Sequence, residues 1–161
     1  MSAPTYDALL ALIDVLDDIR GPDAGYFNDF GDRIHTAEMD PAANGEELKR
    51  GGWIVVRWNA EDFQDTNTGE EDHTKAATEI GLDVWLPETS SSPGVSNALE
   101  IATKAGLDLL KAVNVAFHAR PEIKGAWVTR IVRGTGLPGV VAKVIATVRF
   151  YEVIDYAAIG P

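Results

Sequence analysis

The amino-acid sequence predicts an α+β fold, with a mainly antiparallel sheet of four to five strands flanked by two helices. Two long segments, residues 4–20 and 93–119, repeat apolar side chains at helical spacing. Shorter segments rich in β-branched and aromatic residues lie between and after them, and the last is Val140–Ile154, a long run without Gly or Pro. The length of 161 residues suits one domain with its own core, so we expect a single domain over residues 1–161.

The first helix is predicted over Pro4–Arg20, where apolar and acidic side chains occupy opposite sides. Gly21 and Pro22 then form the expected stop, because Gly tolerates a left-handed conformation and Pro cannot continue a helix. The apolar positions are Tyr6, Leu9, Leu10, Ile13, Leu16 and Ile19.

The next part of the chain predicts a short strand at Arg33–Met39 and a polar loop at Asp40–Gly52. Trp53–Trp58 is nearly all apolar and predicts a strand buried on both faces. Asn59–Lys75 is strongly acidic and predicts a long loop, whereas Ala76–Leu86 alternates and predicts a half-exposed strand. We expect these two strands to form an antiparallel hairpin with a long tip.

In the second half, Pro93–Ala119 predicts a helix, Trp127–Val132 a strand, and residues 134–139 a turn. The last strand, Val140–Ile154, has apolar even positions from Val140 to Phe150, so one face should be fully buried. Its odd positions mix apolar residues with Lys143, Thr147 and Arg149, so the other face should be only partly buried.

The formal net charge of −11 is unevenly distributed along the chain. Residues 1–90 hold six Lys/Arg and twenty Asp/Glu, and residues 91–161 hold eight Lys/Arg and five Asp/Glu. A solvated acidic surface explains this asymmetry, and so does contact between an acidic patch on one copy and a basic patch on the next. The net charge disfavours tight non-specific binding to nucleic acid, because phosphates would be repelled.

No apolar stretch is long enough to span a bilayer, and Met1–Pro4 lacks the pattern of a signal peptide, so we expect a soluble protein that is not secreted by that route. The chain has no cysteine, which excludes disulfides, thiolate nucleophiles and thiolate metal sites. No serine lies in a Gly-x-Ser-x-Gly motif. His35, His73 and His118 lack metal-binding spacing, and His118 is better explained as a cation near a helix C-terminus.

Two further motifs have simple explanations. Asp65–Glu70 resembles a calcium loop, but its Gly69 is fifth and the twelfth residue is Ala76. Gly134-x-Gly136 precedes a predicted strand, whereas phosphate loops precede a helix, so it indicates a hairpin turn. The four tryptophans, Trp53, Trp58, Trp85 and Trp127, are predicted to fill the core, and an interface role is the alternative.

Taken together, the order of these segments resembles that of the tail terminator, or tail completion, proteins of long-tailed bacteriophages. The similarity covers most of the chain and is carried by the opening helix, Tyr26–Ile34, Trp53–Trp58, the long hairpin tip, the helix through Leu99–Phe117 and the closing strands. Gly51 and Gly52 stand where such proteins often have a proline before the second strand.

The resemblance implies a hexameric ring that caps the tail tube, ends its polymerisation and joins the tail to a head-side connector or stopper protein. DNA would pass through the lumen without specific binding, and neither catalysis, nor a metal, nor a cofactor, nor a membrane is implied. The implied location is the tail or neck of the virion, with assembly in the host cytoplasm. The candidate residues for contact with the next subunit or the tube are Glu61, Asp62, Phe63, Asp65, Glu70, Glu71, Asp72, Lys143, Arg149 and Tyr151.

Three other interpretations remain open. The same fold could occupy another neck or head-tail connector position. A small metal-dependent hydrolase could use the carboxylates Asp62, Asp65, Glu70, Glu71 and Asp72. A monomeric binding module is the third possibility.

Overall fold

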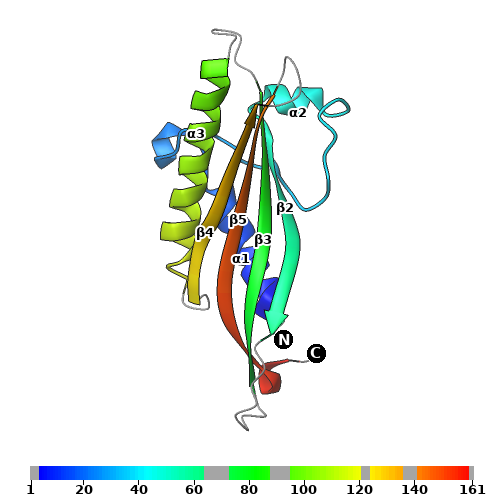
Figure 1. Ribbon diagram of the computed structural model, residues 1–161, viewed down its shortest axis with the longest axis vertical. Helices are drawn as coiled ribbons and strands as arrows, with labels where there is room; N and C mark the ends of the chain where they lie inside the picture. Colours follow the sequence, from blue (N-terminus) through cyan, green and yellow to red (C-terminus); the bar gives the residue numbers. More distant parts are fainter. Residues whose placement is uncertain (1–3, 64–72, 88–94, 121–123, 136–140, 160–161) are drawn as a thin grey trace.

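A computed structural model describes residues 4–63, 73–87, 95–120, 124–135 and 141–159 (Figure 1). Its strands form one five-stranded sheet in the order β1-β2-β3-β5-β4. The strand bounds are β1 Ile34–His35, β2 Trp53–Phe63, β3 His73–Pro87, β4 Lys124–Thr135 and β5 Val141–Asp155. The helices are α1 Pro4–Asp17, α2 Gly45–Lys49 and α3 Val95–Lys111, with α3 continuing as a π-helical segment, η2, at Ala112–Phe117.

The predicted α+β class is confirmed, and the sheet is mixed rather than purely antiparallel. Only β1 runs parallel to its neighbour β2, and the pairs β2–β3, β3–β5 and β4–β5 are all antiparallel. The predicted β2–β3 hairpin is therefore also confirmed. The strand expected at Arg33–Met39 shortens to the two residues of β1.

The closing strand β5 has the predicted two-sided character. Ala142, Val144, Ala146, Val148 and Phe150 are all buried, and the odd positions between them are half-buried. This alternation follows from the period of two along a strand, which directs successive side chains to opposite faces. β5 is an interior strand of the sheet, between β3 and β4.

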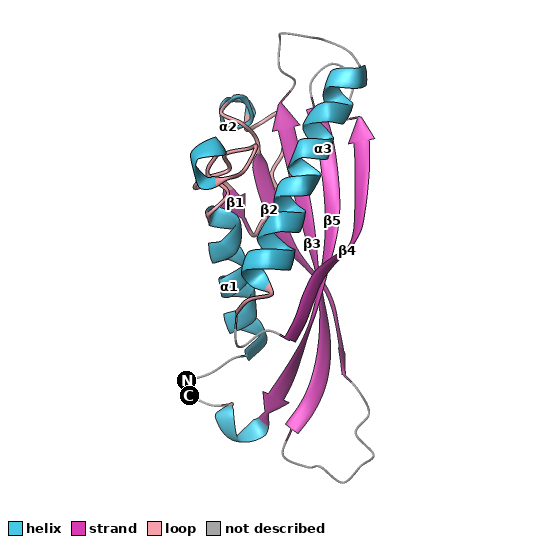
Figure 2. Ribbon diagram, turned by 90° about the vertical axis from the view of Figure 1, so that its left-hand side faces the viewer, coloured by secondary structure: helices cyan, strands magenta, loops and turns pink. Residues whose placement is uncertain are grey.

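Both long helices cover the face to which the even-numbered residues of β5 point (Figure 2). Leu12 and Leu16 of α1 and Leu109 and Phe117 of the α3–η2 segment are fully buried there. The Phe117 ring packs edge-to-face on Phe150, with ring centroids 5.5 Å apart. This layer is the main hydrophobic core, and its burial is the largest favourable term in folding.

The short helix α2 lies on the other side of the strands from α3 (Figure 1). The prediction of a loop over Asp40–Gly52 is wrong for Gly45–Lys49, which is helical. Leu48 of α2 forms a second, smaller core with Trp53, Val55 and the half-buried Trp85. Helix α2 therefore covers the upper end of a sheet face that α1 and α3 leave open.

The predicted bounds of the acidic loop, Asn59–Lys75, are wrong at both ends, because β2 extends to Phe63 and β3 begins at His73. Only residues 64–72 between them lie outside the described part. The prediction of a half-exposed strand at Ala76–Leu86 is also wrong, since β3 lies at the centre of the sheet. Asp83 is buried beside Arg57, whose Nη2 lies 2.9 Å from Asp83 Oδ1.

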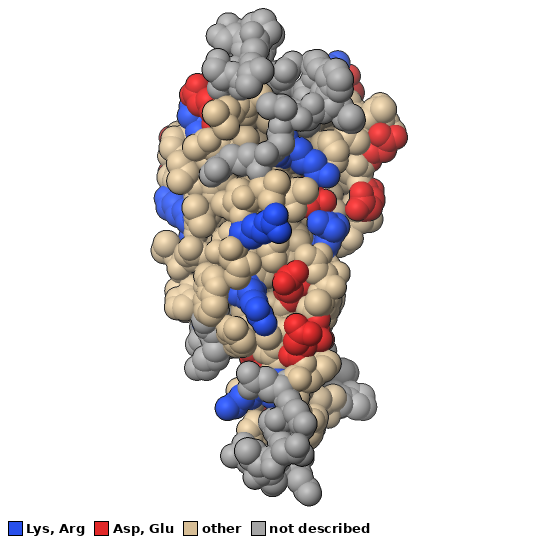
Figure 3. All heavy atoms as spheres, in the orientation of Figure 1, with Lys and Arg blue, Asp and Glu red and all other residues tan. Residues whose placement is uncertain are grey.

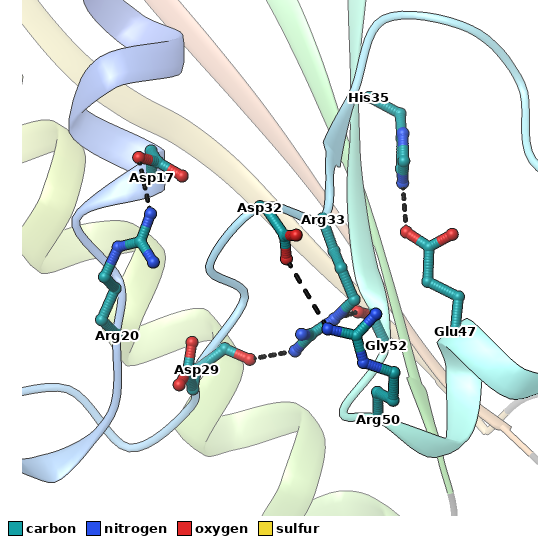
Figure 4. A network of polar contacts seen from close by, with 9 residues as sticks. All are labelled: Asp17, Arg20, Asp29, Asp32, Arg33, His35, Glu47, Arg50 and Gly52. Atoms are coloured by element: carbon teal, nitrogen blue, oxygen red, sulfur yellow. Dashed lines mark hydrogen bonds and ion pairs between the residues drawn. The ribbon is translucent and has the colours of Figure 1, made fainter.

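A polar network fixes the segment between α1 and β2 (Figure 4). The Arg33 side chain is buried, and it donates from Nε to the Gly52 carbonyl at 2.7 Å and from Nη2 to the Asp29 carbonyl. His35 Nε2 lies 2.5 Å from Glu47 Oε1, which ties β1 to α2. These contacts hold the outer strand β1 against β2.

Glycine is required where this segment enters β2. Gly51 and Gly52 have φ values of 125° and 81°, which a proline ring cannot adopt because it fixes φ near −65°. A Cβ on Gly52 would lie 1.8 Å from the Trp85 carbonyl oxygen. The departure from proline at this position thus follows from the close approach of this turn to β3.

Candidate functional site

The candidate site is the open face of the sheet, which we define as the side opposite α1 and α3. Cross-strand partners share a face, so the register identifies its members. Row by row, from the α2 end to the distal end, they are Trp85 with Lys143; Val55, Asp83, Ile145 and Val132; Arg57, Gly81, Thr147 and Arg130; Ala60, Glu79, Arg149 and Trp127; and Asp62, Ala77 and Tyr151.

Cations and aromatic rings lie together on the β4 and β5 side of this face. Lys143 Nζ lies 4.4 Å from the centroid of the Trp85 ring, and Arg149 Cζ lies 5.7 Å from that of Tyr151. The Trp127 ring completes the group, with its centroid 5.7 Å from that of Tyr151. Cation–π contacts of this kind hold long side chains in place while leaving their charge available to a partner.

We call Arg130, Lys143 and Arg149, together with Trp127, Ile145 and Tyr151, the basic stripe. Trp, Tyr and Arg are the residues enriched at the centres of protein interfaces. Trp127 and Val132 are exposed although both are large and apolar. The composition of the stripe is therefore that of a docking surface rather than of an ordinary solvated sheet.

Acidic residues lie on the opposite side of the same face. Asp62 on β2 is exposed, and Glu79 on β3 is half-buried and accepts a hydrogen bond from Asn59 Nδ2 at 3.4 Å. In Figure 3, Lys and Arg gather around the middle of the view, and several Asp and Glu lie to their right, on the side of β2. The charge asymmetry of the sequence is thus also an asymmetry across the sheet.

An ion pair between Arg57 and Asp83 lies on the β2 and β3 side of the same face. Arg57 also lies over Gly81, where its Nη2 is 3.0 Å from the position that a Cβ would take. Because Asp83 is buried and paired, its charge is compensated within the chain. Asp62 and Glu79 thus carry the acidic character of the β2 side.

The structure brings together some of the residues predicted from the sequence and separates others. Lys143, Arg149 and Tyr151 share the open face, whereas Asp62 and Phe63 lie at the distal end of β2 and are exposed. Glu61 is half-buried on the same strand. The other predicted acids, Asp65, Glu70, Glu71 and Asp72, lie outside the described residues, and the interface role of all ten stays a prediction.

Sequence reasoning missed Arg130 and Glu79 as members of this surface, and it gave Trp85 and Trp127 an interface role only as the alternative to the core. The tryptophans were expected in the core, yet within the described residues only Trp53 is fully buried, and Trp58 and Trp127 are exposed. The alternation around Glu79 and Arg130 was visible in the sequence. What the sequence did not show was the register that places Glu79 opposite Arg149 and Arg130 opposite Thr147.

The described residues include no cluster of three or more His, Asp or Glu side chains placed to hold a metal ion. His118 Nδ1 lies 3.1 Å from the Ala126 carbonyl oxygen, and His35 pairs with Glu47, so both have structural contacts. Within the same residues, no helix combines the length and the apolar character needed to cross a membrane.

Comparison with known proteins gives a structural likeness but no family. No protein-family model matches the sequence. No curated protein matches it either. Among solved structures, the chain is similar to one in the virion of a native gene transfer agent (GTA) particle, with a TM-score of 0.44 and 16% sequence identity. The likeness covers 92% of this chain and 90% of that chain.

Proposed function

We propose that this protein is a non-enzymatic virion structural protein. It assembles into a hexameric ring that caps the tail tube, stops its polymerisation and joins it to a head-side connector. The proposal takes the hexameric ring and its two partners from the resemblance carried by Tyr26–Ile34, Trp53–Trp58 and the long hairpin. Ring formation then needs a surface that recognises a second copy.

The observation that carries the proposal is the open face with its segregated charges. A closed ring of identical copies uses heterologous contacts, in which two different patches of the same chain meet. The basic stripe on the β4 and β5 side and Asp62 on the distal part of β2 are two such patches. Complementary charge also speeds correct encounter and fixes the register of the contact.

The acidic hairpin tip has a separate role in the proposal. Asp65, Glu70, Glu71 and Asp72 follow directly from the distal end of β2 and precede β3. We propose that these carboxylates either border the ring opening, where negative charge lets DNA pass without sticking, or contact the tube.

The function is tested by adding the purified protein to polymerising tail tube protein and measuring tube lengths by electron microscopy. We expect the mean length to fall as the ratio of this protein to tube protein rises. Unchanged lengths at every ratio would exclude termination. Binding to an isolated head-side connector without any effect on tubes would instead assign the protein to another neck position.

A further inference from the structure

We infer that neighbouring copies join through the distal part of β2 on one copy and the β4 side of the open face on the next. Ala60 and Asp62 of one copy are placed against Trp127, Arg149 and Tyr151 of its neighbour. This inference deepens the proposed function and rests on its ring of identical copies, but it names the residues that make the ring.

The direction of the strands allows this arrangement. β2 is antiparallel to β3, β3 to β5 and β5 to β4, so β2 and β4 run in opposite directions at opposite sides of the sheet. β1 pairs with β2 only at Ile54 and Val55, which leaves the distal part of β2 as the outer strand. Copies placed side by side in one orientation therefore bring the β4 side of one next to the distal β2 of the other.

The two patches also lie at the same height along the strands. Ala60 is in one row with Glu79, Arg149 and Trp127 across the full width of the sheet, and Asp62 is in the row of Tyr151. Cyclic symmetry relates copies by rotation without a rise along the axis, so patches that meet in a closed ring must share a height. With the strands along the ring axis, these patches satisfy that requirement.

The chemistry of the two patches is complementary. Ala60 and Asp62 are exposed on the open face at the distal end of β2, and Trp127 is 40% exposed on the same face at the β4 side. Burying the Trp127 ring against the exposed Ala60 would remove apolar surface from water, and Asp62 would meet the cation of Arg149. An apolar anchor bordered by a charge pair is the usual composition of a specific interface.

Side chains, rather than an added backbone strand, make this contact on the β4 side. Val128 N donates to Asn114 Oδ1 at 3.0 Å, and His118 Nδ1 bonds the Ala126 carbonyl at 3.1 Å. Both partners come from η2 and its C-terminal end and occupy the outward backbone groups of β4 at this height. Irregular register between Lys124 and Trp127 and between Val128 and Arg130 further disfavours addition of a strand.

The first test reverses the charges of the pair and then restores them. Asp62→Arg and Arg149→Asp are each expected to lower the association constant at least about tenfold, because like charges then face each other. The double variant should recover most of the parental association. Molar mass is measured by light scattering over a range of concentrations, and circular dichroism checks that each variant is folded. Single variants as oligomeric as the parent, or a double variant without recovery, would overturn the inference.

The second test uses the absence of natural cysteines. Ala60→Cys combined with Trp127→Cys should give a ladder of disulfide-linked oligomers on mild oxidation, and neither variant alone should exceed a dimer. Ala60→Cys with Val132→Cys is the matched control, because Val132 lies in the row of Ile145, about 13 Å farther along the strands, beyond disulfide reach. A ladder from the control pair, or none from the test pair, would contradict the inferred contact.

The experiments can refute the inferred contact between copies and the proposed capping function independently of each other. If the ladder and the charge recovery are observed but tubes keep their lengths, the contact stands and the capping function is wrong. If tubes shorten but neither the ladder nor the recovery is observed, the function stands and the copies join elsewhere.

Discussion

The Asp108 carboxylate on α3 binds the backbone and side chain of Asn28, and so anchors the segment that precedes β1. Asp108 Oδ2 accepts hydrogen bonds from Asn28 N and Asn28 Nδ2, both at 2.8 Å, and Oδ1 accepts one from Phe27 N at 2.9 Å. Asp108 is only 2% exposed. One buried carboxylate thus satisfies three donors that are eighty positions away in the chain.

Replacing this carboxylate should loosen the whole segment. Asp108→Ala removes the three acceptor contacts and leaves part-buried donors unsatisfied, so we expect a loss of about 3 kcal/mol in the free energy of unfolding. Urea denaturation measures this loss. Asp14→Ala, at an exposed position of α1, is the matched control and should change stability by less than about 0.5 kcal/mol. Equal effects of the two substitutions would contradict the anchoring role.

The turn into β2 gives a prediction about backbone conformation. Gly52→Ala forces a Cβ toward the Trp85 carbonyl at a positive φ, so the variant should lose about 3 kcal/mol or more, or fail to fold. Gly45→Ala is the control, since nothing lies within 4 Å of its added Cβ and Ala favours a helix. Thermal unfolding of both variants measures the difference, and a stable Gly52→Ala protein would show that the turn is not constrained in this way.

Stability at alkaline pH should depend on Tyr26. Burial raises the pKa of the Tyr26 phenol above its ordinary value of 10.0, and the nearby charges of Asp18 and Asp108 raise it further. The folded state therefore holds the phenolic proton more tightly than the unfolded chain. This contribution is fully present below pH 10 and is lost as the pH rises through the folded pKa.

The corresponding experiment compares thermal midpoints of the parent and Tyr26→Phe between pH 8 and pH 11. We expect the parent to lose more stability over this range, because its phenol must ionise on unfolding. Tyr26→Phe keeps the aromatic ring over which Lys111 Nζ lies, so the difference between the two profiles reports on the phenol. Parallel pH profiles would count against a raised Tyr26 pKa.

Charge reversal in the basic stripe should affect assembly and leave the fold intact. Lys143 and Arg149 are half-buried side chains of the open face, each held over an aromatic ring. Lys143→Glu combined with Arg149→Glu should lower the oligomeric mass at a given concentration, as measured by sedimentation velocity. Lys49→Glu with Arg50→Glu makes the same change in net charge on exposed residues at the end of α2, and should leave the mass unchanged. The stripe is not an interface if the two double variants behave alike.

Much of the fold could be predicted because its long elements carry strong periodic patterns. The alternation of β5 and the apolar spacing of α1 depend on local geometry alone, and both were found close to their observed bounds. Helix α2 was missed because its five residues, Gly45–Lys49, include one large apolar side chain and are too few to display a helical period. Its one buried residue, Leu48, is buried because it packs against Trp53 and Val55 of β2, a contact that the sequence does not show.

The rest of the surface could not be predicted from the sequence, because it is formed by contacts between distant parts of the chain. The distal ends of β2 and β3 look like an acidic loop in sequence, and pairing with β5 makes β3 an interior strand despite its polar residues. Likewise, Lys143 meets Trp85 only because the register of β5 against β3 makes them partners. A period of two identifies the two faces of a strand, but it does not identify the neighbours on each face.

The most direct measurement of the central claim is the position of gold-labelled protein on assembled tail tubes, seen by electron microscopy. A ring that ends polymerisation should place label at one end of each tube, with labelled tubes shorter than unlabelled ones. The Lys143→Glu, Arg149→Glu variant should lose both effects. Label distributed along tube walls, or label at the ends of tubes that continue to grow, would contradict the claim.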